Sequence, residues 1–364
     1  MPDTPVVKKP ALFETDKKSA LDAISQAQFI AFAPYIFQAS VLLRDSGILH
    51  EVETKRSAGI TIDEVVAKVK MSPYGVRILL EAGLGIGLVY QQDNKFFLAK
   101  TGHFFLNDPM SRINTDFMRD VCYDGAQDLK KSIEEGKPHG LRHLGPWPTI
   151  YQGLSILPEP AKSSWFHFDH YYSDNAFPEA LPLVFASNPK KIMDIGANTG
   201  KWTLACLEHN SQVEVGLVDL RVQLNVAEKN IADAGYSDRV QLYERNMLDP
   251  ETTLPKDYDI IWMSQFLDCF SDDEIVAILE KCHAALDDSG RVFINETFWD
   301  RQRFEASALS LQMTSLYFTT MANGNSQMYD SKVFVQLIDT AGFKIVNQTD
   351  NVGLSHTILE LTKK

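Results

Sequence analysis

The stretch KKIMDIGANTGKW, residues 190–202, constrains the fold of this chain more than any other segment. A short apolar run over residues 192–195 leads into a turn that contains Gly196 and Gly200, and a helical pattern begins at Trp202. A glycine-rich turn between a buried strand and a helix is where α/β folds commonly bind nucleotide-like ligands. Strand and helix patterns then alternate to the end of the chain, which predicts a doubly wound, mostly parallel sheet.

The predicted sheet occupies residues 188–364 and has a Rossmann-like α/β architecture. Its strands are expected at KIMDIG, VEVGLVDL, VQLYERN, YDIIWMSQ, GRVFINET, FKIVNQ and HTILELT. The last two strands are close in sequence, so we expect an antiparallel hairpin at one edge of the sheet.

The turn itself, D-I-G-A-N-T-G, is neither G-x-G-x-x-G nor G-x-x-x-x-G-K-[ST], so it need not bind a pyrophosphate. Asp194 ends the first strand and can accept a hydrogen bond from an ammonium group. Asp219 ends the second strand and can accept both hydroxyls of a ribose. After the third strand, Asn246 and Met247 can flank an adenine. An amino acid, a ribose and an adenine without phosphate make S-adenosylmethionine; the alternative is an NAD-type Rossmann domain with a degenerate loop.

The N-terminal region has the pattern of a winged helix. Thr61 and Glu64 form a capping box, Ser72-Pro73 begins a second helix, and LVYQQDNKFFLA predicts a hairpin around Asp93-Asn94. A DNA-binding winged helix needs a basic stripe. Residues 1–105 hold 12 Lys+Arg against 11 Asp+Glu, which disfavours that use. The segment QFIAFAPYIFQASVLL has apolar residues on more than one face, which favours dimerisation.

Charge and composition narrow the class of protein further. The net charge of −13 argues against a nucleic-acid or anionic-membrane partner. We expect no membrane span, no secretory signal and four reduced cysteines, hence a cytoplasmic protein. The expected domains are an arm (1–20), a winged-helix dimerisation domain (21–105), a helical connector (106–187) and a cofactor-binding domain (188–364). Aromatic residues are frequent in the connector and serve either as core filling or as the wall of a ligand pocket.

The chain resembles the class I S-adenosylmethionine-dependent methyltransferases, on the loop DIGANTG, the acid in GLVDL and the segment ERNML. A winged-helix domain, a helical connector and a Rossmann-like domain make it similar to the small-molecule O-methyltransferases of the caffeate, isoflavone and hydroxyindole type and their bacterial antibiotic-tailoring relatives. This resemblance implies a homodimer, a small aromatic or polyketide-like acceptor with a hydroxyl group, and no metal. The remaining cofactor residues are expected to be Asn198, Leu220, Ser264 and Gln265.

The resemblance breaks at the residues for acid–base chemistry. The family motif H-D-W-S-D-E corresponds to LDCFSDDE here, which puts Asp268 in the place of the catalytic His. One supporting Glu falls on Glu296, and the other falls near Met328. The segment FDHYYS resembles the family's F-N-x-x-M-S, so His170 is a second candidate base. The expected substrate pocket contains Phe168, Tyr172, Phe266, Tyr317, Met321 and Asn323.

Three interpretations of Asp268 stay open from the sequence. It can act as a base if burial or Glu296 raises its pKa; the acceptor can arrive already ionised; or Asp268 can be an ordinary carboxylate at a helix start. Two other functions also remain: a methyltransferase-fold hydroxylase or decarboxylase that uses S-adenosylmethionine structurally, and a non-catalytic winged-helix metabolite sensor.

Overall fold

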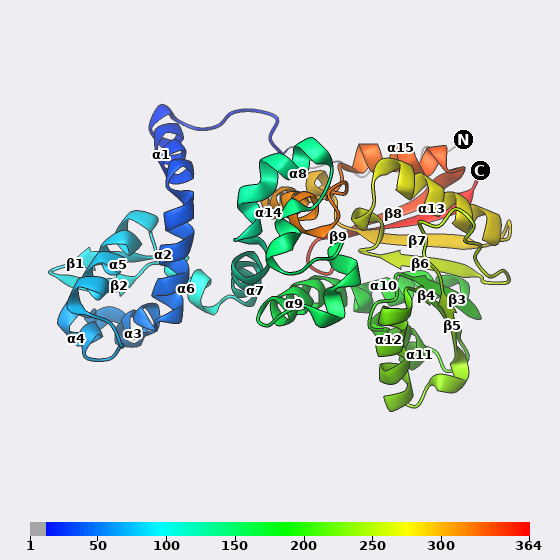
Figure 1. Ribbon diagram of the computed structural model, residues 1–364, viewed down its shortest axis with the longest axis horizontal. Helices are drawn as coiled ribbons and strands as arrows, with labels where there is room; N and C mark the ends of the chain where they lie inside the picture. Colours follow the sequence, from blue (N-terminus) through cyan, green and yellow to red (C-terminus); the bar gives the residue numbers. More distant parts are fainter. Residues whose placement is uncertain (1–11) are drawn as a thin grey trace. The chain divides into compact units, whose positions relative to one another are not determined.

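The structure is a computed structural model that describes residues 12–364, so most of the predicted arm (residues 1–11) lies outside the described residues. The chain forms two compact units, Glu14–Arg119 and, with Phe13, Asp120–Lys364 (Figure 1). The first unit runs past the expected domain end at residue 105 because α6 packs on α3 and α7 packs on α6.

The N-terminal unit has the element order of a winged helix. Thr61 and Glu64 form the predicted capping box, and Ser72 caps α5 with Pro73 as the first helical residue. Asp93 and Asn94 both have positive φ, as a tight hairpin turn between β1 and β2 requires. The elements are α1 (Ala20–Ala31), α2 (Ala33–Asp45), α3 (Ile48–Lys55), α4 (Ile62–Val66), α5 (Pro73–Ile86), β1 (Val89–Gln92), β2 (Lys95–Leu98), α6 (Lys100–Asn107) and α7 (Pro109–Phe117).

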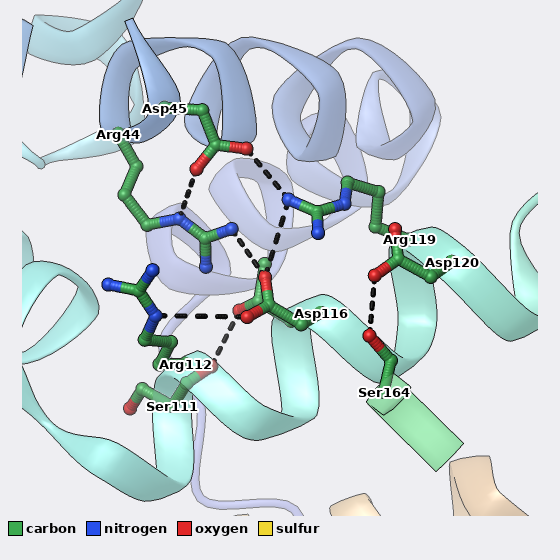
Figure 2. Close-up of polar contacts among 9 residues, drawn as sticks. Arg44, Asp45, Ser111, Arg112, Asp116, Arg119, Asp120 and Ser164 are labelled. Carbon is green, nitrogen blue, oxygen red and sulfur yellow. Dashed lines mark hydrogen bonds and ion pairs between the residues drawn. The ribbon is translucent and has the colours of Figure 1, made fainter. Parts of the chain in front are cut away.

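An ion-pair network ties α2 to α7 and the residues that follow it. Arg44 is 5% exposed, and its guanidinium contacts the carboxylates of Asp45 at 2.7 Å and Asp116 at 2.5 Å. Arg119 reaches the same two carboxylates, and Arg112 also contacts Asp116, so three arginines share two acids, as Figure 2 shows. Since a buried charge is costly unless it is paired, this network stabilises the fold only as a complete set.

Helix α1 lies apart from the core of its unit, and none of its residues is buried. Its apolar side chains stay in solvent, with Leu21 at 77% exposure, Ile24 at 61% and Ile30 at 66%. Among residues 12–364, no single helix is long and apolar enough to cross a bilayer; α1 and α2 reach that length and composition only as a pair, which is bent by 75°.

The C-terminal unit is built on a seven-stranded sheet of order β5-β4-β3-β6-β7-β9-β8. Neighbours from β5 to β7 are parallel, and β9 pairs antiparallel with both β7 and β8, which confirms the predicted edge hairpin. The strands are β3 (Lys191–Ile195), β4 (Glu214–Asp219), β5 (Val240–Glu244), β6 (Ile260–Ser264), β7 (Arg291–Glu296), β8 (Phe343–Val352) and β9 (His356–Lys363).

Helices cover both faces of this sheet (Figure 1). Side chains alternate along each central strand, so Trp262 packs towards α10, α11 and α12 while its neighbours Ile261 and Met263 pack towards α13 and α15. Trp202 of α11 stacks on Trp262 with ring centroids 4.0 Å apart. The helices are α8 (Leu129–Glu135), α9 (Ala161–Ser173), α10 (Phe177–Val184), α11 (Lys201–His209), α12 (Arg221–Asp233), α13 (Asp272–Ala285), α14 (Glu305–Tyr317) and α15 (Ser331–Thr340).

Candidate functional site

The predicted site residues gather at the carboxyl ends of the parallel strands. Asp194 is the second-last residue of β3, Asp219 ends β4 and Glu296 ends β7. Ser264 ends β6, and Asn246 is the second residue after β5. In a doubly wound sheet these ends meet along one edge, where ligands bind. The fold therefore brings together residues that are more than 100 positions apart in sequence.

Two glycines let the backbone turn sharply between β3 and α11. Gly196 has φ +77° and Gly200 has φ +79°, a region that side-chain-bearing residues adopt only at a cost. A Cβ on Gly196 would lie 2.3 Å from a ring carbon of Phe266, so the loop after β6 packs directly on this glycine. The glycine loop, residues 196–200, is thereby held against the segment that carries Asp268.

The carboxylate of Asp219 organises this loop through its backbone. The Asn198 N–H donates to Asp219 Oδ2 at 2.9 Å, and the Leu220 N–H donates to Oδ1 at 2.7 Å. Burial raises the pKa of Asp219 to about 6, although both hydrogen bonds favour the ionised form. Asp194 is 3% exposed and accepts a hydrogen bond from Thr203 Oγ1 at 2.7 Å, and burial raises its pKa to about 7.

Several acceptor atoms around the glycine loop are buried without a hydrogen-bond donor. They include Asn198 Oδ1, Thr199 Oγ1 and Gln265 Oε1. A buried polar atom without a partner is costly. A ligand with amino and hydroxyl donors would satisfy these acceptors, so the residues present fit the amino-acid and ribose parts of S-adenosylmethionine. At the predicted adenine side, Met247 is buried, whereas Asn246 is exposed and its Oδ1 accepts the Leu248 N–H.

Asp268 lies in a 3₁₀ turn, Leu267–Cys269, between β6 and α13, and is 4% exposed. The N-cap of α13 is Ser271, which forms a capping box with Glu274, so the interpretation of Asp268 as a helix-start carboxylate is wrong. Burial raises the pKa of Asp268 to about 7. The turn thus presents a carboxyl group that titrates near neutral pH.

Glu296 holds this turn in place. It is 1% exposed, and its Oε1 accepts the backbone N–H groups of Phe266 at 3.0 Å and Leu267 at 2.8 Å. Burial and the neighbouring charge of Asp268 raise the pKa of Glu296 well above its usual range. Met328, near the position of the family's second Glu, is buried and its sulfur accepts the Thr297 hydroxyl at 3.2 Å.

The residues predicted to line the acceptor pocket lie on the C-terminal unit, and Asn323 contacts the 3₁₀ turn directly. The Asn323 side-chain amide donates to the carbonyl of Cys269 at 2.6 Å, and the Tyr317 hydroxyl accepts from Trp165 Nε1 at 2.7 Å. The remaining predicted members lie on the same unit: Phe266 against Gly196, Met321 against Gly125 and Gly140, and Phe168 against Tyr172 with centroids 5.1 Å apart.

Sequence reasoning missed two residues here. The Tyr151 hydroxyl is buried without a hydrogen-bond partner. Its pKa is raised mainly by burial and to a smaller extent by its neighbours Cys269, Tyr317 and Asp268. The Asp169 carboxyl accepts a hydrogen bond from Asn198 Nδ2 at 3.1 Å. Burial, and after it the charge of Asp268, raises the pKa of Asp169 to about 7. Asp169 falls on the Asn of the family's F-N-x-x-M-S segment, a signal that its neighbour His170 obscured.

His170 occupies a different environment from Asp268. Its ring stacks on Phe166, and its Nδ1 lies 3.9 Å from an oxygen of Asp169 and 3.8 Å from one of Asp174. Burial and the charge of Lys201 lower its pKa. Its role as a base stays a prediction. In residues 12–364, no group of three or more His, Cys, Asp or Glu side chains is arranged to hold a metal ion.

Comparison with known proteins assigns both units. Residues 25–96 match the Dimerisation2-like domain, and residues 179–344 match the O-methyltransferase domain. In both units the chain resembles the S-adenosylmethionine-dependent O-methyltransferases. It is a methyltransferase with S-adenosylmethionine as its cofactor, and the fold predicted from the sequence is confirmed.

Relatives span nearly the whole chain. An L-tyrosine C(3)-methyltransferase from Streptomyces lavendulae is 24% identical over 345 residues, which cover 94% of this chain and 92% of the relative. The crystal structure of the S-adenosylmethionine-dependent methyltransferase SibL covers 93% of this chain and 99% of its own at 22% identity, with a TM-score of 0.70. The O-methyltransferase NcsB1, in complex with S-adenosylmethionine and 2-hydroxy-5-methyl naphthoic acid, covers 96% and 100% at 18% identity, with a TM-score of 0.66.

Proposed function

We propose that this methyltransferase acts on a hydroxyl group of a small aromatic natural product, with Asp268 as the base that takes up the hydroxyl proton. The observation that carries the proposal is the buried carboxyl of Asp268, which has a pKa of about 7 and neighbours the phenol of Tyr151. S-adenosylmethionine supplies an electrophilic methyl group on a positively charged sulfur.

A carboxylate with an ordinary pKa near 3.9 is a weak base towards a phenol of pKa near 10. A base that titrates near the working pH is more effective, because a usable fraction is ionised while its proton affinity is high. Asp268 accepts the proton as the phenol oxygen bonds to the methyl carbon and the carbon–sulfur bond breaks. A cation and a carboxylate thereby become two neutral groups, so the buried site gains no net charge.

Glu296 positions this base rather than replacing it. Its Oε1 already accepts the N–H groups of Phe266 and Leu267, which precede Asp268. Holding a reactive group within a narrow range of positions is itself a large contribution to rate. We therefore assign Glu296 the support of the turn.

The aromatic nature of the acceptor rests on two observations. Tyr151 lies near Asp268, Cys269 and Tyr317, and Trp165 donates a hydrogen bond to the Tyr317 hydroxyl, so an aromatic cluster adjoins this carboxyl. Two similar proteins act on or bind phenolic rings by name, L-tyrosine and 2-hydroxy-5-methyl naphthoic acid. The first of these is a C-methyltransferase, so methylation of a ring carbon next to the hydroxyl is the second candidate. Deprotonation by Asp268 would assist both reactions, since a phenolate is nucleophilic at oxygen and at the ortho carbon.

The test is the pH dependence of methyl transfer in the wild type, Asp268→Asn and the control Asp273→Asn, which alters an exposed carboxylate at the start of α13. The wild-type rate should fall as pH drops through about 7, because Asp268 is then protonated. Asp268→Asn should lower the rate about 10²–10⁴-fold, while Asp273→Asn retains it. An Asp268→Asn enzyme with the full rate and a profile set by the acceptor's own pKa would contradict the assignment.

We further propose that the N-terminal unit forms a homodimer through α1. A helix with several largely exposed apolar side chains is poorly soluble unless a partner covers it. The match of residues 25–96 to a Dimerisation2-like domain favours a second copy of this chain as that partner.

A further inference from the structure

Asp169 connects the glycine loop to the acceptor side of the site, and the proposed chemistry gives it no role. It lies on α9, and its Oδ2 accepts the side-chain amide of Asn198 at 3.1 Å. Asn198 is itself fixed by its backbone bond to Asp219. On the other side Asp169 lies close enough to Asp268 for the charge of Asp268 to raise its pKa. The carboxyl of Asp169 therefore stands where the cofactor loop and the 3₁₀ turn meet.

The charged groups around Asp169 leave the two carboxyls without a cation of their own. Lys201 stabilises ionised Asp169 at a distance, but its ammonium is bonded to Asp174. His170, 3.9 Å away, has a lowered pKa and is neutral at pH 7. The groups that face Asp169 are thus Asp268, Asp174, Lys201, His170 and the phenol of Tyr317.

Two further atoms indicate that a polar ligand binds next to these carboxyls. Asn198 Oδ1 and Glu296 Oε2 are buried without a hydrogen-bond partner; Asn198 is bonded to Asp169, and Glu296 neighbours Asp268. The Asp169 side chain keeps 23% of its surface accessible, unlike Glu296, so a ligand can reach it. Two neighbouring carboxyls that are largely shielded from water attract a cation more strongly than the same pair in water would.

We propose that Asp169, together with Asp268, binds the positive charge of the cofactor's sulfonium and so makes the enzyme prefer S-adenosylmethionine over its demethylated product. The transferred methyl must leave the cofactor towards the acceptor, and the carboxyl pair lies between the glycine loop and the acceptor residues. Once the methyl is transferred, the sulfur is neutral and Asp268 holds a proton. Asp169 then faces no cation, which weakens the binding of the product and favours its release.

The proposal is tested by titration calorimetry without any acceptor, so its outcome is independent of the acceptor and of Asp268 as a base. The ligands are S-adenosylmethionine, S-adenosylhomocysteine and an analogue with a protonated amine in place of the methylsulfonium. The variant Asp169→Asn removes the charge but keeps an oxygen for the Asn198 amide. It should lower the affinity ratio of each cationic ligand over S-adenosylhomocysteine about tenfold, as expected for one charge at an effective dielectric constant near 20 after allowance for partial exposure.

The control is Asp174→Asn, which removes a more exposed carboxylate that is paired with Lys201. It should change the ratio less than about twofold, as surface pairs usually do. If Asp169 only supported the loop, Asp169→Asn would weaken all three ligands equally and leave the ratio unchanged, which would overturn the proposal. An equal fall of the affinity ratio in Asp174→Asn would overturn it as well. The preference for cationic ligands would then come from the summed negative charge of the region and not from Asp169. Asp169→Ser serves as the second variant, and near-ultraviolet circular dichroism checks its fold.

The number of protons released on ligand binding gives a second readout, which would not change if Asp169 had a purely structural role. A cation beside Asp169 and Asp268 favours their ionised forms, so near pH 7 cationic ligands should release protons on binding and S-adenosylhomocysteine should release fewer. Repeating the calorimetry in buffers of different ionisation enthalpy measures this difference. It should shrink in Asp169→Asn, and an undiminished difference would count against the proposal.

Discussion

Replacing Gly196 by Ala should destabilise the C-terminal unit and disturb the turn that carries Asp268. The backbone there has φ +77°, which costs an alanine about 1–2 kcal/mol. The new Cβ would lie 2.3 Å from Cδ2 and 2.7 Å from Cγ of Phe266. These atoms are near the root of the side chain, so a rotation of the ring does not clear the clash. Forcing a methyl into a packed place adds about 1–3 kcal/mol, for a total of about 2–5 kcal/mol.

Two other glycines provide matched controls for this prediction. Gly235 has φ +80° but nothing within 4 Å of an added Cβ, so Gly235→Ala should cost only the backbone term, about 1–2 kcal/mol. Gly200 has φ +79° and a Cβ would meet Ala227 at 3.2 Å, so Gly200→Ala should fall between the two. The expected order of destabilisation is Gly235→Ala, Gly200→Ala, Gly196→Ala.

Urea unfolding followed by tryptophan fluorescence measures the loss of stability of the C-terminal unit in each variant. All five tryptophans lie after residue 119, so the signal reports only the C-terminal unit. Equal losses in Gly196→Ala and Gly235→Ala would refute the packing of Phe266 on the glycine loop. Methyl transfer should fall further than stability in Gly196→Ala, since Phe266 leads directly into the turn of Asp268.

Other perturbations have equally definite outcomes. Asp219→Ala should weaken S-adenosylmethionine binding by roughly 1–3 kcal/mol, because ribose hydroxyls lose their acceptor and the loop loses its tie to Asn198; calorimetry with an unchanged affinity would remove Asp219 from the site. Ile24→Asp combined with Ile30→Asp should turn the dimer into a monomer by light scattering, and an unaffected dimer would place the interface elsewhere. His356 is fully buried with a pKa of about 4, so the unfolded chain binds its proton first as pH falls. Stability should therefore drop by up to about 3 kcal/mol between pH 6.5 and 4, and His356→Phe should flatten that drop in acid denaturation.

Local signals explain why so much of the fold was predictable. The glycine loop, the capping box at Thr61, the hairpin at Asp93-Asn94 and the alternation of strand and helix each depend on residues adjacent in sequence. The edge hairpin of β8 and β9 followed from its short connection. The first unit's end at Arg119 did not follow, because it depends on how α6 and α7 pack.

The candidate site was harder because its chemistry comes from distant contacts. The sequence pointed to Asp268 and Glu296, but not to the use of Glu296 as the acceptor for two backbone N–H groups 29 and 30 residues away. Asp169 and His170 are neighbours on α9, and only the packing of that helix decides which one approaches Asp268. Tyr151 lies in a 3₁₀ turn, Ile150–Gln152, without periodicity that would have indicated a buried hydroxyl.

The most direct test of the account uses S-adenosylmethionine with a ¹³C-labelled methyl group and a panel of small phenols. Mass spectrometry and ¹³C NMR of the products identify whether and where the label arrives. We expect an aromatic product with the label as a methoxy carbon, formed together with one equivalent of S-adenosylhomocysteine. A label on a ring carbon would select the second candidate, C-methylation. Conversion of an acceptor with no label transferred and no S-adenosylhomocysteine formed would contradict methyl transfer as the reaction of this chain.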